Sequence, residues 1–327
     1  MPSPRLRKFM LTLLIGGAVL HVAWSSAMAL LLSSRYTHRM VDVRRWPGEV
    51  EVRRTAEMVA MYLARKVSPS PPPTTVFFGS SVAYGYPWPE DVGVTARYAA
   101  LHPSEHVFNA SVIGADLAFI ENAVLCGATN AGLRIDTAIV ELQVILSVVS
   151  LARDAFWNFA PPKPCDETIG RVGQWSFVMR HPLGAGWLPF IWDDKASPKP
   201  DQPLGVVPLY MGDFISRADY DRFEVESKLQ AQIATVLNRA KTIARQVYAF
   251  PSPVYLPGVR EARFEAESVH AQQQAALAAC RNVPGVHCLD PESFYTRREL
   301  YWNLTHFNQH GQQVFADWLA ESIKPPD

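Results

Sequence analysis

The sequence predicts an α/β fold, in which helices cover both faces of a parallel sheet and one N-terminal transmembrane helix precedes the folded domain. Short apolar runs with the character of strands alternate with segments of helical periodicity, which is typical of a parallel sheet. A run without charged residues near the N-terminus indicates the membrane helix. Of the 327 residues, 48% are apolar and 19% are charged, so the chain can fill a large core.

The charge balance excludes one broad class of function. Lys and Arg total 31 and Asp and Glu total 31, so the formal net charge is zero. A nucleic-acid-binding protein is expected to show a basic excess or a basic stripe on its surface. We therefore expect no nucleic-acid partner.

The N-terminal segment from Phe9 to Ser34 contains no Lys, Arg, Asp or Glu. At a rise of about 1.5 Å per residue, one helix of this length exceeds the ~30 Å hydrocarbon core of a bilayer. A basic flank precedes the segment and favours a cytoplasmic N-terminus. We expect residues 1–35 to form a signal anchor that leaves the bulk of the chain extracytoplasmic, on the periplasmic side of a bacterial inner membrane. The alternative is a cleaved signal peptide, because Ala27-Met28-Ala29 has the form of a cleavage site.

Residues 36–73 are expected to connect the anchor to the folded domain. The pattern predicts a juxtamembrane helix from Glu49 to Lys66, followed by a stiff Pro-rich linker that ends at Pro73. The folded domain is then expected to cover residues 74–327.

Within that domain, strands and helices are expected to alternate. The run at residues 137–142 is almost continuously apolar, as a buried parallel strand should be. The expected strands are Thr75–Phe78, His106–Asn109, Thr137–Leu142, Gln246–Phe250 and Val286–Leu289, and the expected helices are Leu117–Leu125, Asp221–Arg245, Ala262–Cys280 and Gln309–Ile323.

A Trp- and Pro-rich stretch at about residues 150–218 interrupts this rhythm and is too long for an ordinary connection. We interpret it as an insertion that packs beside the ligand-binding edge of the sheet. Two roles stay open for its four tryptophans: they stack on sugar rings, or they fill a small core of their own. The tryptophans are Trp157, Trp175, Trp187 and Trp192.

The four cysteines fit an exported domain. Cys280 and Cys288 flank a short loop that a disulfide can close, which leaves Cys126 and Cys165 to pair. The alternative is four buried free thiols, and four cysteines allow three pairings. No cysteines have the spacing of zinc ligands.

Two polar positions point to nucleophilic catalysis. Ligands of an open parallel sheet bind outside the carboxyl ends of the strands. Ser81 follows the first strand, in the turn Gly79-Ser80-Ser81. A serine hydroxyl needs a base to remove its proton. His306 follows the fifth strand and precedes the last helix, so it is placed to face Ser81 across the strand ends.

These segments resemble, in the same order, the sequence blocks of SGNH/GDSL-type serine hydrolases, a family with a flavodoxin-like sheet. Phe77-Phe78-Gly79-Ser80-Ser81 resembles the first block, with Ser80 in the place of its aspartate. Gly114 fits the second block, and Asn303-Leu304-Thr305-His306 fits the last, with Asn303 in the place of an aspartate. The resemblance implies Ser81 as nucleophile, His306 as base, Asn303 as the residue that orients the histidine, and the N–H groups of Ser81 and Gly114 as oxyanion donors.

The sequence departs from the family pattern in three places. The third block, Gly-x-Asn, is missing, and Gln143 is the candidate that supplies a side-chain amide to the oxyanion instead. Ser80 gives a Gly-Ser-Ser opening that resembles membrane-anchored relatives in cell-envelope acylation. Asn303 lacks the negative charge that stabilises an imidazolium, and in a chymotrypsin-type triad the aspartate-to-asparagine change costs about 10⁴ in turnover. Asp290 is an alternative carboxylate for this role.

The leading hypothesis is a membrane-anchored serine acyl esterase or O-acyltransferase that acts on a cell-surface or exported polysaccharide. This chemistry needs no metal or organic cofactor, and the acyl donor and the polysaccharide are the expected partners. The resemblance also implies a multi-span membrane acyltransferase as a partner. The alternative is a catalytically decayed module that binds glycan or acts as a scaffold in an envelope assembly.

Overall fold

The computed structural model describes residues 4–32, 73–86, 88, 92–112, 114–130, 132–145, 147, 165, 223–261 and 266–324. The expected juxtamembrane helix and nearly all of the Pro-rich linker lie outside these ranges. The expected insertion at 150–218 also lies outside them, apart from Cys165.

A five-stranded parallel sheet forms the centre of the domain, in the order β2-β1-β3-β4-β5. This is the flavodoxin-like order, in which the chain moves to one side of β1 and then returns to the other. The strands are β1 (Thr74–Phe78), β2 (His106–Asn109), β3 (Ile135–Leu142), β4 (Ala244–Pro251) and β5 (Val286–Cys288). The expected α/β fold with a parallel sheet is therefore confirmed.

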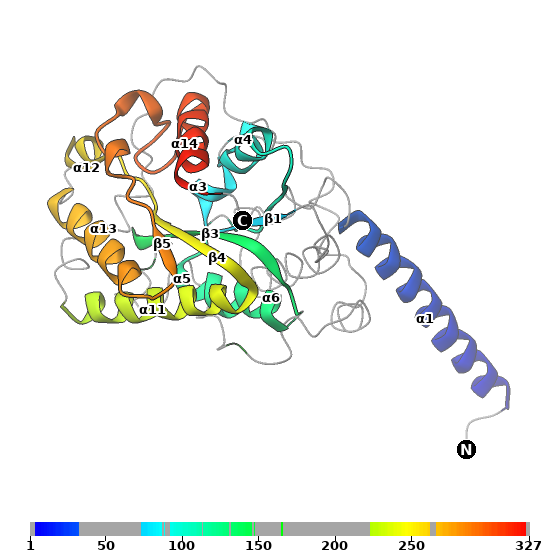
Figure 1. Ribbon diagram of the computed structural model, residues 1–327. Helices are drawn as coiled ribbons and strands as arrows, with labels where there is room; N and C mark the ends of the chain where they lie inside the picture. Colours follow the sequence, from blue (N-terminus) through cyan, green and yellow to red (C-terminus); the bar gives the residue numbers. More distant parts are fainter. Residues whose placement is uncertain are drawn as a thin grey trace.

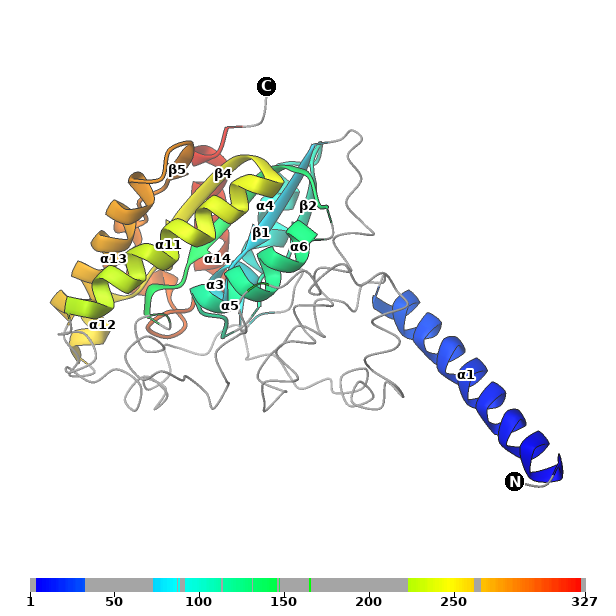
Figure 2. The same ribbon diagram turned by 90° about the horizontal axis from the view of Figure 1, so that it is seen from below.

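Helices cover both faces of the sheet (Figure 1). One face carries α3 (Ser81–Tyr84), α4 (Val94–Leu101) and α14 (Gln309–Ser322). The other carries α5 (Leu117–Phe119), the π-helix η4 (Ile120–Leu125), α6 (Cys126–Asn130), α11 (Phe223–Ile243) and α13 (Ala266–Arg281). Figure 2 shows α11 lying along β4, with α13 and α6 on its two sides. The described part of the domain also contains the short helices α12 (Leu256–Glu261), η6 (Glu292–Phe294) and η7 (Arg298–Leu300).

The core lies between these layers. Strand β3 is buried along almost its whole length, which explains its apolar sequence. Phe315 of α14 packs against Phe307 with tilted rings and against Phe250 of β4 edge to face, at centroid distances of 5.0 and 5.2 Å. This aromatic cluster packs α14 against the sheet, close to the loop that carries His306.

Several element bounds differ from the sequence prediction. The helix expected at 117–125 consists of α5 and the π-helix η4, and the chain continues directly beyond it as α6. The helix expected to end at Arg245 ends at Ile243, because Ala244 already pairs with Ile135 in the sheet. Helices α3 and α4 were not expected, since the segment between β1 and β2 has no strong helical periodicity.

The N-terminal helix α1 spans Pro4–Leu32. Its large apolar side chains from Phe9 to Leu20 are exposed. Among the described residues, no helix has both the length and the apolar character that crossing a membrane requires. The signal anchor at 1–35 stays a prediction.

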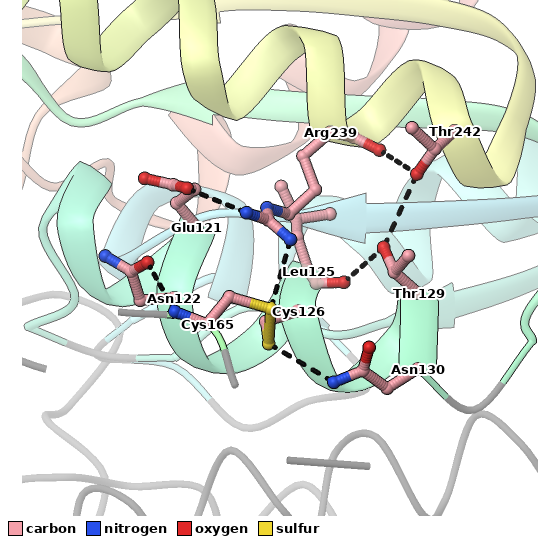
Figure 3. The surroundings of a disulfide bond; sticks show 9 residues. All are labelled: Glu121, Asn122, Leu125, Cys126, Thr129, Asn130, Cys165, Arg239 and Thr242. Carbon is pink, nitrogen blue, oxygen red and sulfur yellow. Dashed lines mark hydrogen bonds and ion pairs between the residues drawn. A yellow bond between two sulfur atoms is a disulfide. The ribbon is translucent and has the colours of Figure 1, made fainter. Parts of the chain in front are cut away.

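All four cysteines form disulfides, so the expected pairing is confirmed and the free-thiol alternative is wrong. Cys280 at the end of α13 pairs with Cys288 at the end of β5. Cys126 at the start of α6 pairs with Cys165 (Figure 3). Arg239 of α11 donates to Cys165 Sγ at 3.1 Å and pairs with Glu121 of η4 at 3.1 Å, so this disulfide lies in a polar cluster under α11.

Candidate active site

Ser81 is the first residue of α3, directly beyond the carboxyl end of β1. Its exposed fraction is 6%, so the hydroxyl is nearly covered but still accessible. The loop that follows β2 runs beside this turn, because Val112 N–H donates to the Gly79 carbonyl at 2.9 Å. The turn Gly79-Ser80-Ser81, called the nucleophile turn from here on, is thus held between β1, the β2 loop and β3.

His306 lies on a tight loop between η7 and α14. An antiparallel bridge between Tyr301 and Phe307 closes the loop, and the His306 carbonyl accepts from Trp302 N–H at 2.8 Å. Trp88 Nε1 donates to the Phe307 carbonyl at 2.8 Å, which ties this loop to the segment after β1. The loop therefore has one well-defined position relative to Ser81.

The structure brings Ser81, His306 and Asn303 together in one hydrogen-bonded line. His306 Nε2 lies 2.8 Å from Ser81 Oγ, although the two residues are separated by 225 positions. His306 Nδ1 lies 2.9 Å from Asn303 Oδ1. A nucleophile, a base within hydrogen-bond reach and a third group that orients the base are the geometric signature of an activated serine.

Two backbone groups determine which way the Asn303 amide points. The N–H groups of Thr305 and His306 approach one side-chain atom of Asn303 at 2.9 and 2.8 Å. Backbone N–H groups only donate, so that atom is the oxygen. The same oxygen faces His306 Nδ1, which must therefore carry the proton. The lone pair of Nε2 is then left to accept from the Ser81 hydroxyl, as a general base requires.

Two of the expected oxyanion donors are backbone N–H groups without an acceptor among the described residues. The Ser81 N–H makes no hydrogen bond there, whereas the N–H groups of Ser80 and Ala83 on either side of it do. Gly114 lies in the turn that begins at Val112, with φ of 80°, and a side chain at this position would meet no atom within 4 Å. Both donors are thus available for a ligand.

Gln143, the third expected oxyanion donor, is placed differently. It directly follows β3 and is buried, and its carbonyl accepts from the backbone and hydroxyl of Ser147. No hydrogen bond among the described residues joins it to Ser81 or His306. Its buried Oε1 has no partner there. The structure therefore places Gln143 at the correct end of the sheet but does not bring it into contact with the serine.

Asp290, the alternative orienting carboxylate, is engaged elsewhere. Its Oδ1 accepts from Glu292 N–H at 3.1 Å, and its Oδ2 lies 3.7 Å from Arg281. Asn303 is the residue that contacts the imidazole.

Sequence reasoning missed two aromatic side chains beside the histidine. The Tyr86 ring meets the His306 ring edge to face at a centroid distance of 4.8 Å, and Trp302 lies 6.1 Å from Tyr86. Tyr86 and Trp302 are both partly exposed. In the sequence, the position of Trp302 directly before Asn303 could have indicated an aromatic residue at the site.

A buried carboxylate below the nucleophile turn was also missed. Glu141 of β3 is completely buried, and burial raises the pKa of its carboxyl group, although hydrogen bonds from Ala83, Ser252 and Ser80 oppose part of this rise. An acidic residue inside an otherwise apolar strand was the signal in the sequence.

Among the described residues, no group of three His, Cys, Asp or Glu side chains is placed to hold a metal ion.

A histidine within hydrogen-bond reach of a serine, at the carboxyl edge of a parallel sheet, is an arrangement that can support nucleophilic catalysis. No protein-family model matches the chain, and no curated protein matches it. Solved structures to which the chain is similar at low identity include an acetyl xylan esterase and a lipolytic protein of the G-D-S-L family.

Three of these structures are typical. An acetyl xylan esterase, AlAXEase, is 10% identical with a TM-score of 0.43, over 77% of this chain and 100% of that one. A catalytic mutant of Axe2, an acetylxylan esterase from Geobacillus stearothermophilus, is 12% identical with a TM-score of 0.43, over 80% and 100%. A member of the lipolytic protein G-D-S-L family from Veillonella parvula DSM 2008 is 11% identical with a TM-score of 0.41, over 76% and 97%.

Proposed function

We propose that the chain is an SGNH-like serine acyl esterase or O-acyltransferase. The contact of 2.8 Å between His306 Nε2 and Ser81 Oγ is the observation that carries this proposal. If the site had lost its catalytic function, nothing would favour the imidazole tautomer that accepts a hydrogen bond from the serine. The oxygen of Asn303 imposes that tautomer here.

The reaction begins with the Ser81 hydroxyl. Its oxygen forms a bond to the acyl carbonyl carbon, while His306 Nε2 takes the hydroxyl proton. The negative charge that develops on the carbonyl oxygen is stabilised by the N–H groups of Ser81 and Gly114. The carbon–oxygen bond to the leaving alcohol then breaks, and the alcohol takes the proton from His306.

An acyl group is now held on Ser81 Oγ. Water or a sugar hydroxyl gives a proton to His306 Nε2 and attacks the acyl carbon, and the bond to Ser81 breaks as the serine regains its proton. Water makes the protein an esterase, and a sugar hydroxyl makes it a transferase.

The aromatic pair beside His306 supports a carbohydrate as one substrate. The Tyr86 ring contacts the ring of the base that deprotonates the incoming hydroxyl, the Trp302 ring contacts Tyr86, and both residues are partly exposed. Binding sites combine such apolar walls with a few placed polar groups. A cell-surface or exported polysaccharide fits this combination.

The membrane anchor and a multi-span acyltransferase partner belong to the same proposal. The segment from Phe9 to Ser34 without charged residues and the two disulfides support an exported, anchored domain. An anchor would keep Ser81 near a membrane protein that delivers acyl groups.

A fluorophosphonate probe tests the proposal, because it forms a covalent bond only with an activated serine. The purified full chain should be labelled at Ser81, as located by peptide mass spectrometry, and should hydrolyse an acetylated oligosaccharide. Ser81→Ala should remove the label, and His306→Ala should slow labelling at least 100-fold. The matched control is Ser111→Ala, which removes a buried hydroxyl from the neighbouring β2 loop. Absence of labelling in the folded wild type would support the glycan-binding module instead.

A further inference from the structure

Glu141 is a buried ionisable group to which the proposed reaction assigns no step. It lies on β3, one residue before the end of the strand, and its exposed fraction is 0%. A carboxylate without hydrogen bonds at such a position would be strongly destabilising. The hydrogen-bond partners of Glu141 therefore indicate its role.

All of its hydrogen bonds go to segments at the carboxyl edge of the sheet. Oε2 accepts from Ser80 N–H and from Ala83 N–H, each at 2.8 Å. Oε1 is 2.7 Å from Ser252 Oγ, just beyond β4. One carboxyl group thus joins the nucleophile turn after β1 to the ends of β3 and β4.

Glu141 takes the place of the N-cap hydrogen bond that Ser80 does not make. Ser80 is the N-cap residue of α3, and an N-cap serine normally accepts from the N–H two or three residues later. Here Ser80 makes no such bond, and its buried hydroxyl has no partner among the described residues. The Ala83 N–H at that position is bound by Glu141 instead.

The turn is also shaped to admit this carboxyl group. A Cβ atom on Gly79 would lie 2.6 Å from Glu141 Cβ and 2.8 Å from its Oε2, distances that real Cβ atoms do not adopt. Glycine at position 79 is therefore required for Glu141 to reach Ser80 and Ala83.

The two bonded amides flank Ser81 on both sides. Glu141 holds the N–H before Ser81 and the N–H two residues after it, whereas the Ser81 N–H itself meets no acceptor among the described residues. The backbone at Ser81 is thereby fixed, while its hydroxyl and its N–H are left for the substrate.

We propose that Glu141 is a positioning residue that sets the orientation of Ser81 through the placement of its two oxygens rather than through its charge. This inference rests on the proposed function only for its effect on catalysis, since the effect on the turn can be measured separately. The carboxyl group replaces the missing N-cap bond and locks the turn from the neighbouring strand.

Glutamine and aspartate separate placement from charge at this position. In Glu141→Gln, the amide oxygen can accept from Ser80 and Ala83. The amide nitrogen can donate to Ser252 Oγ, and the Ser252 hydroxyl then turns to the Leu142 carbonyl at 3.3 Å. In Glu141→Asp, the carboxyl group is kept but its oxygens withdraw by one methylene group. Glu121→Gln and Glu121→Asp are the matched controls, because Glu121 is a buried carboxylate outside this network and pairs with Arg239.

Two measurements on the full chain test the proposal: the rate of fluorophosphonate labelling at Ser81, and the rate of hydrogen exchange at the Ser80 and Ala83 amides. We expect Glu141→Asp to slow labelling at least tenfold and to speed exchange at both amides at least tenfold. Glu141→Gln should stay within threefold of the wild type in both. The Glu121 variants should leave both rates within threefold, even where they lower the melting temperature.

The opposite ranking would overturn the proposal. If Glu141→Gln loses labelling while Glu141→Asp keeps it, the charge is what matters. If both variants keep wild-type exchange at Ser80 and Ala83, the carboxyl group does not hold the turn. A wild-type chain that is never labelled would refute the proposed function, and the exchange rates would still decide the role of Glu141.

Discussion

The side-chain oxygen of Asn303 lies 2.9 Å from His306 Nδ1 and also accepts from two backbone N–H groups of its own loop. An aspartate would satisfy the same three donors with either of its oxygens. Asparagine satisfies them only in one orientation, which the backbone enforces. The amide therefore orients the histidine as well as a carboxylate would, but it gives the imidazolium no compensating negative charge.

Replacing Asn303 with aspartate should therefore maintain or increase activity. A carboxylate beside an imidazole raises its basicity and stabilises the imidazolium of the transition state. We expect kcat/KM for an activated ester to stay equal or to rise by up to about tenfold, which corresponds to about 1.4 kcal/mol. Steady-state kinetics of Asn303→Asp against the wild type measures this. A loss of tenfold or more with the fold intact would mean that the amide donor is needed.

The pKa of Glu141 makes a prediction about stability. Burial raises this pKa on folding, so the folded state binds more protons than the unfolded state above the ordinary pKa of the carboxyl group. The unfolding free energy therefore falls as pH rises through that window. Relative to Glu141→Gln, which does not titrate, the wild type should be most stable at low pH and should lose this advantage as pH rises. Urea unfolding of both proteins between about pH 4 and 8 measures the difference. A constant difference, or one of opposite slope, would contradict the raised pKa.

The two disulfides should differ in their contribution to stability. Cys126–Cys165 closes a separation of 39 residues, and Cys280–Cys288 closes one of 8. In the chain-entropy model the longer loop stabilises more, here by about 1.4 kcal/mol. We expect the double serine variant at 126 and 165 to unfold at lower urea than the one at 280 and 288. Non-reducing peptide mapping of the wild type should first find both pairs. Equal urea midpoints would show that local packing outweighs loop entropy.

The proposed signal anchor predicts that the folded domain lies outside the cytoplasm. A reporter fused after Asp327 should be active outside the cytoplasm, and the mature N-terminus should still contain Met10. N-terminal sequencing of the membrane fraction measures the second point. A mature chain that starts at Leu30 would establish the cleaved signal peptide.

The strand positions and the pair of site residues could be predicted because each depends on local sequence. Apolar runs between polar turns identify buried parallel strands, and parallel strands bring the residues that follow them to one edge. The sequence pattern therefore suffices to predict that Ser81 and His306 lie at the same edge of the sheet. The short loop between Cys280 and Cys288 identified one disulfide for the same local reason.

The other features depend on the direction of individual side chains. The tautomer of His306 follows from the backbone N–H groups that orient the Asn303 amide, and the hold on the amides of Ser80 and Ala83 comes from Glu141 on another strand. No periodicity shows either of them, because each of these hydrogen bonds depends on the conformation of a loop or turn and on the direction of a side chain.

The sequence by itself determined the α/β class, the order of the strands along the chain and the serine and histidine at their ends. Periodicity and turn residues encode these properties locally. Only the tertiary structure decided that His306 Nε2 meets Ser81 Oγ, that Asn303 rather than Asp290 holds the imidazole, and that Glu141 caps the nucleophile turn. The physical reason is that hydrogen bonds act over about 3 Å, and only the packing of β1, β3 and the last loop brings these groups within that distance.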